Sequence, residues 1–274
     1  MKRSRISGLA WALLACLSVA PHLAFAFDAP RLPLTVAICD DDNEWPPYSY
    51  FQRSDGKKTS DLAGYSIDVV HHIFSRHGID YTIDLIPWTR CMAVASLGKQ
   101  YGMVLNLSYN AERKRRFLLS RPYYATTSYY YYSRRNNPKG LAIHRLADLK
   151  KYRVCGLQGY NYEGYGLGAG EVDQGARSFP VLISKMKLGR CSLFVEKNEI
   201  MHGYATIGKD YLSDPDIGRA PIPGMKRDPF YFGVSKRAPQ AKELQALIDV
   251  ELRHMEASGK LDELLKRASS RLTD

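Results

Sequence analysis

Glu196, His202 and the adjacent pair His71–His72 are the side chains whose types suit acid–base chemistry. Carboxylates and imidazoles move protons in reactions when they are held against a substrate. His71 and His72 lie in a segment predicted to be helical, where a solvated or core-edge position is the ordinary role of such a pair. The sequence contains no nucleophile accompanied by a base and no metal-binding spacing. It therefore predicts a protein that is not an enzyme and needs no cofactor and no metal.

Cysteine chemistry is the second possibility, because four of the five cysteines follow residue 26. They are Cys39, Cys91, Cys155 and Cys191. No two of them have the close spacing of zinc ligands. An even number in an oxidising compartment favours disulfides, with three possible connectivities. We expect Cys39–Cys91 and Cys155–Cys191, because each pair then falls within one half of the chain; four buried thiols are the alternative.

The elements that must position these residues form two α/β blocks. Strands are predicted at 34–39, 48–51, 81–86 and 103–107, then within 123–133 and at 153–157, 191–195 and 230–234. Helices are predicted from Ser66, their expected N-cap, to 78, and at 87–98, 146–150, 181–187 and, in two pieces, 241–266. Strands that alternate with helices indicate parallel strands with crossover helices. We expect two lobes, each with a mostly parallel sheet, and a ligand cleft beyond the strand ends.

The first 26 residues have the organisation of an export signal. A basic start, residues 1–5, precedes the apolar run 8–20, and small residues surround a cleavage position after Ala26. The apolar run is too short for a mature membrane anchor. We expect a periplasmic protein cleaved after Ala26. A lipoprotein attached through Cys16 is the alternative, because the residues before Cys16 resemble a loose lipobox.

The net charge of +11 raises the question of a nucleic-acid partner. The densest basic run is Arg113 to Arg116, and the remaining bases are scattered along the chain. Nucleic-acid binding requires basic residues gathered on one surface with aromatic residues between them. We therefore expect no nucleic-acid partner and a solvated surface for most of these bases.

Seven short motifs resemble, in order and spacing, the extracellular solute-binding proteins of family 3, the periplasmic receptors of polar amino-acid ABC transporters. The motifs are Trp45–Tyr48, Gly64–Asp68, Pro87–Trp88, Ser108–Arg113, Ser120–Tyr124, Gly189–Arg190 and the tail that begins at Gly259. The likeness covers essentially all of the chain after residue 26.

The resemblance implies the two-lobed periplasmic binding protein fold of type II, in which the chain crosses between the lobes twice. Lobe 1 is then 27–125 plus 230–274, and lobe 2 is 126–229. The crossings at Tyr123–Tyr124 and at Asp228–Phe232 are the expected hinges, about which the lobes close on a ligand. The implied partners are a small-molecule ligand and, transiently, an inner-membrane ABC permease, and the chain is expected to be a monomer.

The resemblance also implies a set of ligand-binding residues. Arg113 takes the position that clamps a ligand's α-carboxylate, a task suited to a planar guanidinium. Ser108 and the backbone around Asn106 add donors to the same carboxylate. Further contacts come from the aromatic walls Trp45 and Trp88, from Asp42 or a neighbour in Asp40 to Asp42, and from the amides of Gly159, Tyr160 and Asn161.

At one position the chain departs from the family pattern. The acid that pairs with the ligand's ammonium group aligns with Lys197, and Glu196 stands beside it. Adjacent strand residues point to opposite faces. Either Glu196 takes the role through a shift of one residue, or the ligand has no ammonium there and Lys197 favours an anionic group.

The resemblance therefore predicts a periplasmic protein that captures a small polar solute with a carboxylate, such as an amino acid, and delivers it to an ABC transporter. Two alternatives use the same fold. One is a ligand-sensing module for a signalling partner, and the other is a periplasmic enzyme of the dehydratase type.

Overall fold

The computed structural model of the protein describes residues 35–168 and 170–270. The predicted export signal, its cleavage after Ala26 and the lipobox at Cys16 lie outside these residues. Within the described part of the chain, no helix combines the length and the apolar character that crossing a membrane would require.

The first sheet has the strand order β4-β1-β5-β13-β6, and β7 pairs with β13. Its strands are β1 (Thr35–Asp41), β4 (Asp80–Ile86), β5 (Met103–Ser108), β6 (Phe117–Leu119), β7 (Tyr124–Thr126) and β13 (Asp228–Ser235). β1 pairs in parallel with β4 and β5, whereas β13 runs antiparallel to β5, β6 and β7. Every residue of β5 is buried, as expected for a central strand that is covered on both faces.

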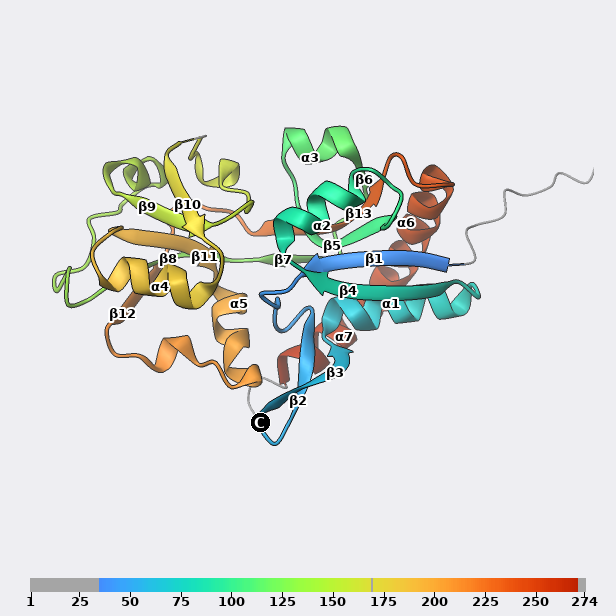
Figure 1. Ribbon diagram of the computed structural model, residues 1–274, viewed down its shortest axis with the longest axis horizontal. Coiled ribbons are helices and arrows are strands. Elements are labelled where there is room, and N and C mark those ends of the chain that lie inside the picture. Colours follow the sequence, from blue (N-terminus) through green and yellow to red (C-terminus); the bar gives the residue numbers. More distant parts are fainter. Residues whose placement is uncertain (1–34, 169, 271–274) are drawn as a thin grey trace, which may run out of the picture. The chain divides into compact units, whose positions relative to one another are not determined.

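Helices cover both faces of this sheet (Figure 1). They are α1 (Tyr65–Arg76), α2 (Trp88–Ala95), α3 (Ala111–Arg116), α6 (Ala241–Ala257) and α7 (Lys260–Ser270). Alternate residues of β1 face opposite sides: Val36 and Ile38 share a core with α1, whereas Cys39 belongs to a core with α2. The strand carboxyl ends are thereby fixed between two packed layers.

The second sheet has the order β10-β9-β11-β8-β12. Its strands are β8 (Ser128–Ser133), β9 (Val154–Leu157), β10 (Val172–Ala176), β11 (Leu193–Lys197) and β12 (Ile217–Pro221). The helices beside it are α4 (Phe179–Lys187) and α5 (Asn198–Gly203), with short 3₁₀ turns η1 (Leu146–Lys151), η2 (Glu163–Tyr165), η3 (Tyr204–Ile207) and η4 (Tyr211–Ser213). β9 is parallel to β10 and β11, but β8 is antiparallel to β11 and β12.

Two local expectations need correction. Both sheets are mixed rather than mostly parallel, because β8, which follows the first crossing, and β13, which contains the second, run against their neighbours. Ser66 is not an N-cap: the helix begins at Tyr65 after Gly64, and the Ser66 hydroxyl donates to Asn106 Oδ1 instead. A hairpin of β2 (Tyr50–Ser54) and β3 (Lys57–Ala63) turns at Asp55-Gly56, and β3 was not predicted.

Both expected disulfides are confirmed. Cys39–Cys91 joins β1 to α2, with a Cα–Cα distance of 5.7 Å. Cys155–Cys191 joins β9 to the turn that precedes β11, with a Cα–Cα distance of 5.8 Å. Both distances are ordinary for a disulfide. The first bridge therefore fixes a strand that ends at the cavity described below, and the second fixes β9 to the segment that leads into β11.

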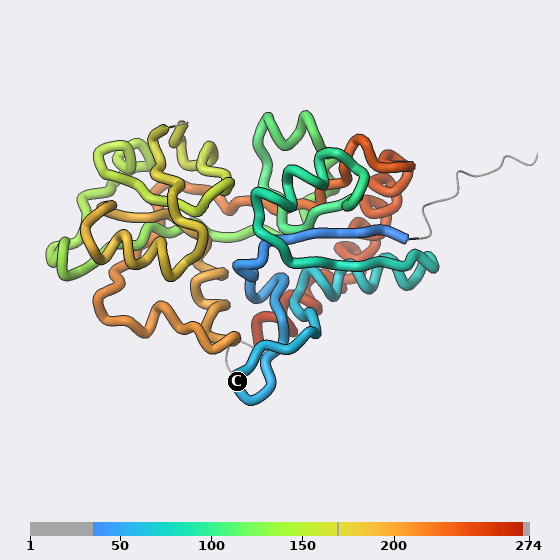
Figure 2. The backbone as a smooth tube through the Cα atoms, viewed as in Figure 1, coloured from blue at the N-terminus to red at the C-terminus, as the bar shows by residue number. Residues whose placement is uncertain are grey.

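The two segments expected to be hinges lie side by side. The start of β13 pairs antiparallel with β7, so that Phe230 stands opposite Tyr124. Figure 2 shows the chain crossing from one half of the molecule to the other in both segments. The rings of Tyr124 and Phe230 stack with centroids 4.9 Å apart, and Tyr48 stacks on the other face of Tyr124 at 3.8 Å. Backbone pairing and aromatic stacking thus couple the two crossings.

Candidate functional site

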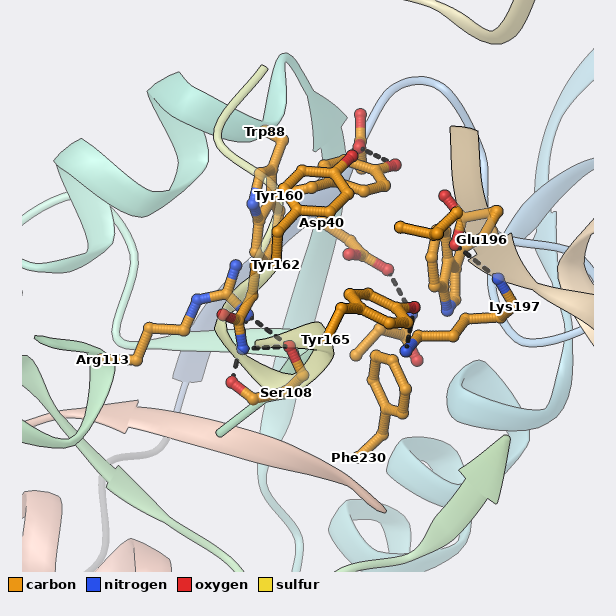
Figure 3. Close-up of a pocket in the computed structure, with 15 residues that line it drawn as sticks. Asp40, Trp88, Ser108, Arg113, Tyr160, Tyr162, Tyr165, Glu196, Lys197 and Phe230 are labelled. Carbon is orange, nitrogen blue, oxygen red and sulfur yellow. Dashed lines mark hydrogen bonds between the residues drawn. The ribbon is translucent and has the colours of Figure 1, made fainter. Parts of the chain in front are cut away.

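A cavity lies where the carboxyl ends of β1, β5 and β11 meet (Figure 3). Its lining residues are Asp40, Asp41, Trp45, Trp88, Asn106, Ser108, Arg113, Tyr160, Asn161, Tyr162, Tyr165, Val195, Glu196, Lys197 and Phe230. The cavity has a volume of about 40 Å³. It is lined by residues of both sheets, from β1 and β5 of the first and from β11 of the second.

All the ligand-binding residues predicted from the sequence, apart from Asp42 and Gly159, line this cavity. Asp42 is exposed, because β1 ends at Asp41 and the chain turns there; its neighbours Asp40 and Asp41 face the cavity instead. Gly159 was expected to contact the ligand through its amide, but both its backbone groups bond to the protein. Its carbonyl oxygen accepts from Trp88 Nε1 at 3.0 Å, while its amide donates to Gln174 Oε1.

Arg113 is a buried cation that forms no ion pair with any carboxylate in the described part of the chain. The side chain of Asn110 caps α3 by accepting from the Arg113 amide, which fixes the start of the helix at the end of β5. The guanidinium donates through Nη1 to the carbonyl and the hydroxyl of Ser108 at 3.0 and 2.7 Å, and through Nη2 to the Gly159 carbonyl at 3.4 Å.

Acidic side chains act on this guanidinium only from a distance, with Glu112 and Asp228 the strongest of them. Arg113 is 6% exposed, and no carboxylate among the described residues forms an ion pair with it. Burial lowers the pKa of Arg113 to about 10, which still leaves the group charged at neutral pH. A buried charge is costly unless it is paired. The geometry therefore favours an anion beside Ser108 and Arg113.

Three carboxyl groups face the cavity from two sheets. Burial raises the pKa of Asp40 to about 6 and those of Asp41 and Glu196 to about 7. Asp41 accepts from the hydroxyl of Tyr160 at 2.7 Å, and Glu196 accepts from the backbone amide of Lys197 at 2.8 Å. The Asp41 charge adds to the effect of burial and raises the pKa of Glu196 further.

Asn106 and Asp40 form a buried network behind the cavity. Asn106 has φ +50°, a backbone conformation uncommon for a residue other than glycine. Its Nδ2 donates to Asp40 at 2.5 Å, and its Oδ1 accepts from Ser66, Tyr123 and Tyr124. The Asn106 side chain is thus engaged by protein groups. It positions Asp40 and β7; that the backbone around Asn106 binds the ligand stays a prediction.

Glu196 and Lys197 both line the cavity, contrary to the expectation that only one of them faces it. The reason is that β11 ends at Lys197 and α5 begins at Asn198, so the cavity reaches around the end of the strand. The Lys197 ammonium is 2.6 Å from Asp228 Oδ2. Burial opposes its charged form, but contact with Tyr165 and Asp228 outweighs burial and holds the pKa of Lys197 above its ordinary value.

Aromatic side chains form most of the remaining wall. Trp45 donates from Nε1 to the Tyr124 hydroxyl at 3.2 Å, and its ring meets Tyr160 edge-on at 5.7 Å. Sequence reasoning missed Tyr162, Tyr165 and Phe230 as cavity residues. The two tyrosines follow the predicted Gly159 loop directly, and that proximity was the available signal.

A profile of the bacterial extracellular solute-binding proteins, family 3, matches residues 34–269. The chain belongs to this family. It is therefore a solute-binding protein of a family of extracellular proteins, and the cavity is its candidate solute site. Among curated protein sequences, none matches the chain. Among the described residues, no group of three or more acidic, histidine or cysteine side chains is placed to hold a metal ion.

Solved structures of similar proteins support the fold. An amino acid ABC transporter substrate-binding protein from Streptococcus pneumoniae, bound to L-arginine, is 19% identical, with a TM-score of 0.65 over 88% of this chain and 97% of that one. The arginine-, lysine-, histidine-binding protein from Geobacillus stearothermophilus is 18% identical, with a TM-score of 0.65 over 88% and 100%. An ancestral amino-acid-binding protein, a precursor of cyclohexadienyl dehydratase, is 16% identical, with a TM-score of 0.62 over 85% and 95%.

Proposed function

We propose that this protein is a periplasmic receptor that captures a small solute with a carboxylate and an ammonium group, an amino acid or a related compound, and delivers it to an ABC permease. The observation that carries the proposal is the buried Arg113 guanidinium, which has no acidic partner among the described residues. A ligand carboxylate would neutralise it and accept two parallel hydrogen bonds. Ser108 lies beside the same position.

The opposite requirement, a place for an ammonium group, is met by Asp41 and Glu196. Both line the cavity, and burial makes both costly to ionise without a cation nearby. A ligand ammonium between them would relieve that cost. This assigns to Glu196 the role that the family pattern places one residue later.

The proposed lobes are 27–125 with 230–274 and 126–229, joined through β7 and the start of β13. Hydrogen bonds link the cavity walls that the two proposed lobes contribute. Tyr160 donates to Asp41 at 2.7 Å, and Trp88 donates to the Gly159 carbonyl at 3.0 Å. Breaking these contacts would widen the small cavity, and re-forming them would enclose a solute. The protein is proposed to be exported by cleavage after Ala26 and to act as a monomer without nucleic acid.

Calorimetric titration tests the proposal. Amino acids, dicarboxylates and polyamines are titrated into the wild type, into Arg113→Ala and into Arg115→Ala, a control on the exposed side of the same helix. We expect an amino acid to bind the wild type and the Arg115 variant equally, and to bind Arg113→Ala about 100-fold more weakly, because a buried charge pair is lost. Equal binding to Arg113→Ala, or no binding to the wild type, would show that the proposal is wrong.

A second candidate function, an elimination reaction such as a dehydration, is favoured by Glu196. Burial raises its pKa to about 7, which suits a general acid at neutral pH, and the group faces the cavity. Solutes that bind are incubated with the wild type and with Glu196→Gln, and their NMR spectra are followed. Consumption of a solute by the wild type alone favours the enzyme, and unchanged spectra favour the receptor.

A further inference from the structure

Lys197 differs from the other cavity cation, Arg113, in having all its donors occupied by protein. An ammonium group carries three N–H donors. Those of Lys197 have three acceptors: Asp228 Oδ2 at 2.6 Å, the Tyr165 hydroxyl at 2.8 Å and Ser128 Oγ at 3.3 Å. The side chain is 7% exposed. Lys197 therefore needs no ligand anion.

The groups around Lys197 form a site suited to a primary ammonium. Its Nζ lies 4.8 Å from the centroid of the Tyr165 ring and 5.8 Å from that of Phe230. A carboxylate, two hydroxyls and two aromatic rings are the partners that stabilise an alkylammonium in a partly desolvated place. Figure 3 shows Lys197 and Arg113 approaching the cavity from opposite sides. This cation site is thus part of the cavity wall and is filled by the chain itself.

Resting on the proposed function, we propose that Lys197 is a specificity-determining residue: it occupies the cation site formed by Asp228, Ser128, Tyr165 and Phe230 and thereby excludes solutes with a second cationic group. The solute class is then amino acids with uncharged side chains. Arginine, lysine and diamines would bring a further positive charge against a fixed ammonium.

The other acidic side chains that line the cavity do not supply a site for a second cationic group of the solute. Burial disfavours the ionisation of both Asp41 and Glu196, and the Asp41 charge adds to that cost for Glu196. The ligand's own ammonium, placed beside these two carboxyl groups, would offset that cost. Asp40 is engaged by Ser49 and Asn106 at 2.5 Å each.

The first test compares solute selectivity. The wild type, Lys197→Ala and Lys197→Ala/Asp228→Asn are titrated with uncharged amino acids and with arginine and lysine; Lys226→Ala, an exposed lysine nearby, is the control. We expect the wild type and the control to prefer uncharged amino acids at least tenfold. In Lys197→Ala the preference should shift at least tenfold toward the cationic amino acids, and the Asp228→Asn change should cancel that shift.

The second test does not depend on the natural solute. Propylammonium has the three carbons and the ammonium that Lys197→Ala removes. Its chloride should raise the melting temperature of Lys197→Ala, with sodium chloride as the salt control, and leave the wild type and the double variant unchanged. Lys197→Arg, which keeps a cation in place, serves as a folded variant that should still exclude arginine and lysine.

The outcomes separate this inference from the proposed function. Arginine binding the wild type as tightly as uncharged amino acids, or Lys197→Ala gaining neither cationic solutes nor propylammonium, overturns the role of Lys197. If no amino acid binds the wild type, the proposed function fails. The propylammonium response then decides alone whether the cation site exists.

Discussion

Gly203 is the position where one added methyl group should hold the proposed lobes apart. It ends α5 with ordinary helical dihedrals, so alanine is compatible with its backbone. A Cβ there would lie 2.2 Å from the Pro46 carbonyl oxygen and 2.5 Å from its carbon. These are backbone atoms, which cannot rotate away. An ordinary contact would require α5 and the Pro46 segment to separate by about 1 Å, and overpacking of this kind costs about 1–3 kcal/mol.

That cost should disfavour closure of the proposed lobes and leave the stability of the fold unchanged. Gly203 and Pro46 belong to different proposed lobes, and the core of each sheet can keep its packing while the lobes part. If the solute binds only the closed arrangement, a penalty of about 1–3 kcal/mol weakens its affinity about 5- to 150-fold. The melting temperature without solute should change little, and the radius of gyration measured by small-angle X-ray scattering should not decrease when solute is added.

Gly102→Ala is the matched control, because its added Cβ would make only an ordinary 3.5 Å contact with the Ala238 side chain. Calorimetry and scattering are run on the wild type and on both variants. If Gly203→Ala binds with the wild-type affinity and contracts like the wild type, the contact between α5 and Pro46 plays no part in solute binding and the reasoning is refuted.

Three further predictions concern stability and the buried network. Burial raises the pKa values of Asp41 and Glu196 to about 7, above those of an unfolded chain, so the folded state holds more protons than the unfolded state. The free energy of unfolding should therefore decrease as pH rises from about 4 to about 7. The melting temperature should fall over this range more for the wild type than for Asp41→Asn/Glu196→Gln, and parallel curves would contradict this. Replacing Cys39 and Cys91 with serine should lower the free energy of unfolding in urea by about 4 kcal/mol in the chain-entropy model, given their separation of 52 residues; an unchanged midpoint would count against it. Asn106→Ala leaves Asp40 and three hydroxyls without a shared partner and should cost more than about 2 kcal/mol, whereas Asn137→Ala, at a half-buried asparagine, should cost less.

The elements that position the site were predictable where pattern and packing agree. The apolar run of β5 and the alternation in β4 were recognised because each strand's burial follows directly from its side chains. β3 was missed because Lys57 to Asp61 are polar, and the strand exists through pairing with β2 alone. Strand direction was misjudged where the chain crosses, because antiparallel pairing there depends on tertiary contacts.

The site was predictable at the level of residue types but not of partners. Arg113 and Ser108 lie five residues apart and meet through a strand end and a helix start, a local geometry that a motif encodes. The pairing of Lys197 with Asp228 spans 31 residues and two elements, and the expectation of opposite faces failed because β11 ends there. The role of Asn106 depends on β7 approaching β5, which no local pattern contains.

The two indoles in the cavity wall give the protein an optical signal of its own. The chain contains three tryptophans, and Trp11 lies within the predicted export signal. Cleavage would leave Trp45 and Trp88, each with its indole N–H bonded to a partner that belongs to a crossing strand or to the facing wall. All tryptophan emission from the processed protein would then come from side chains at the solute site. Solute capture should therefore be measurable in the unlabelled protein by fluorescence excited selectively at tryptophan, because the 19 tyrosines are then not excited.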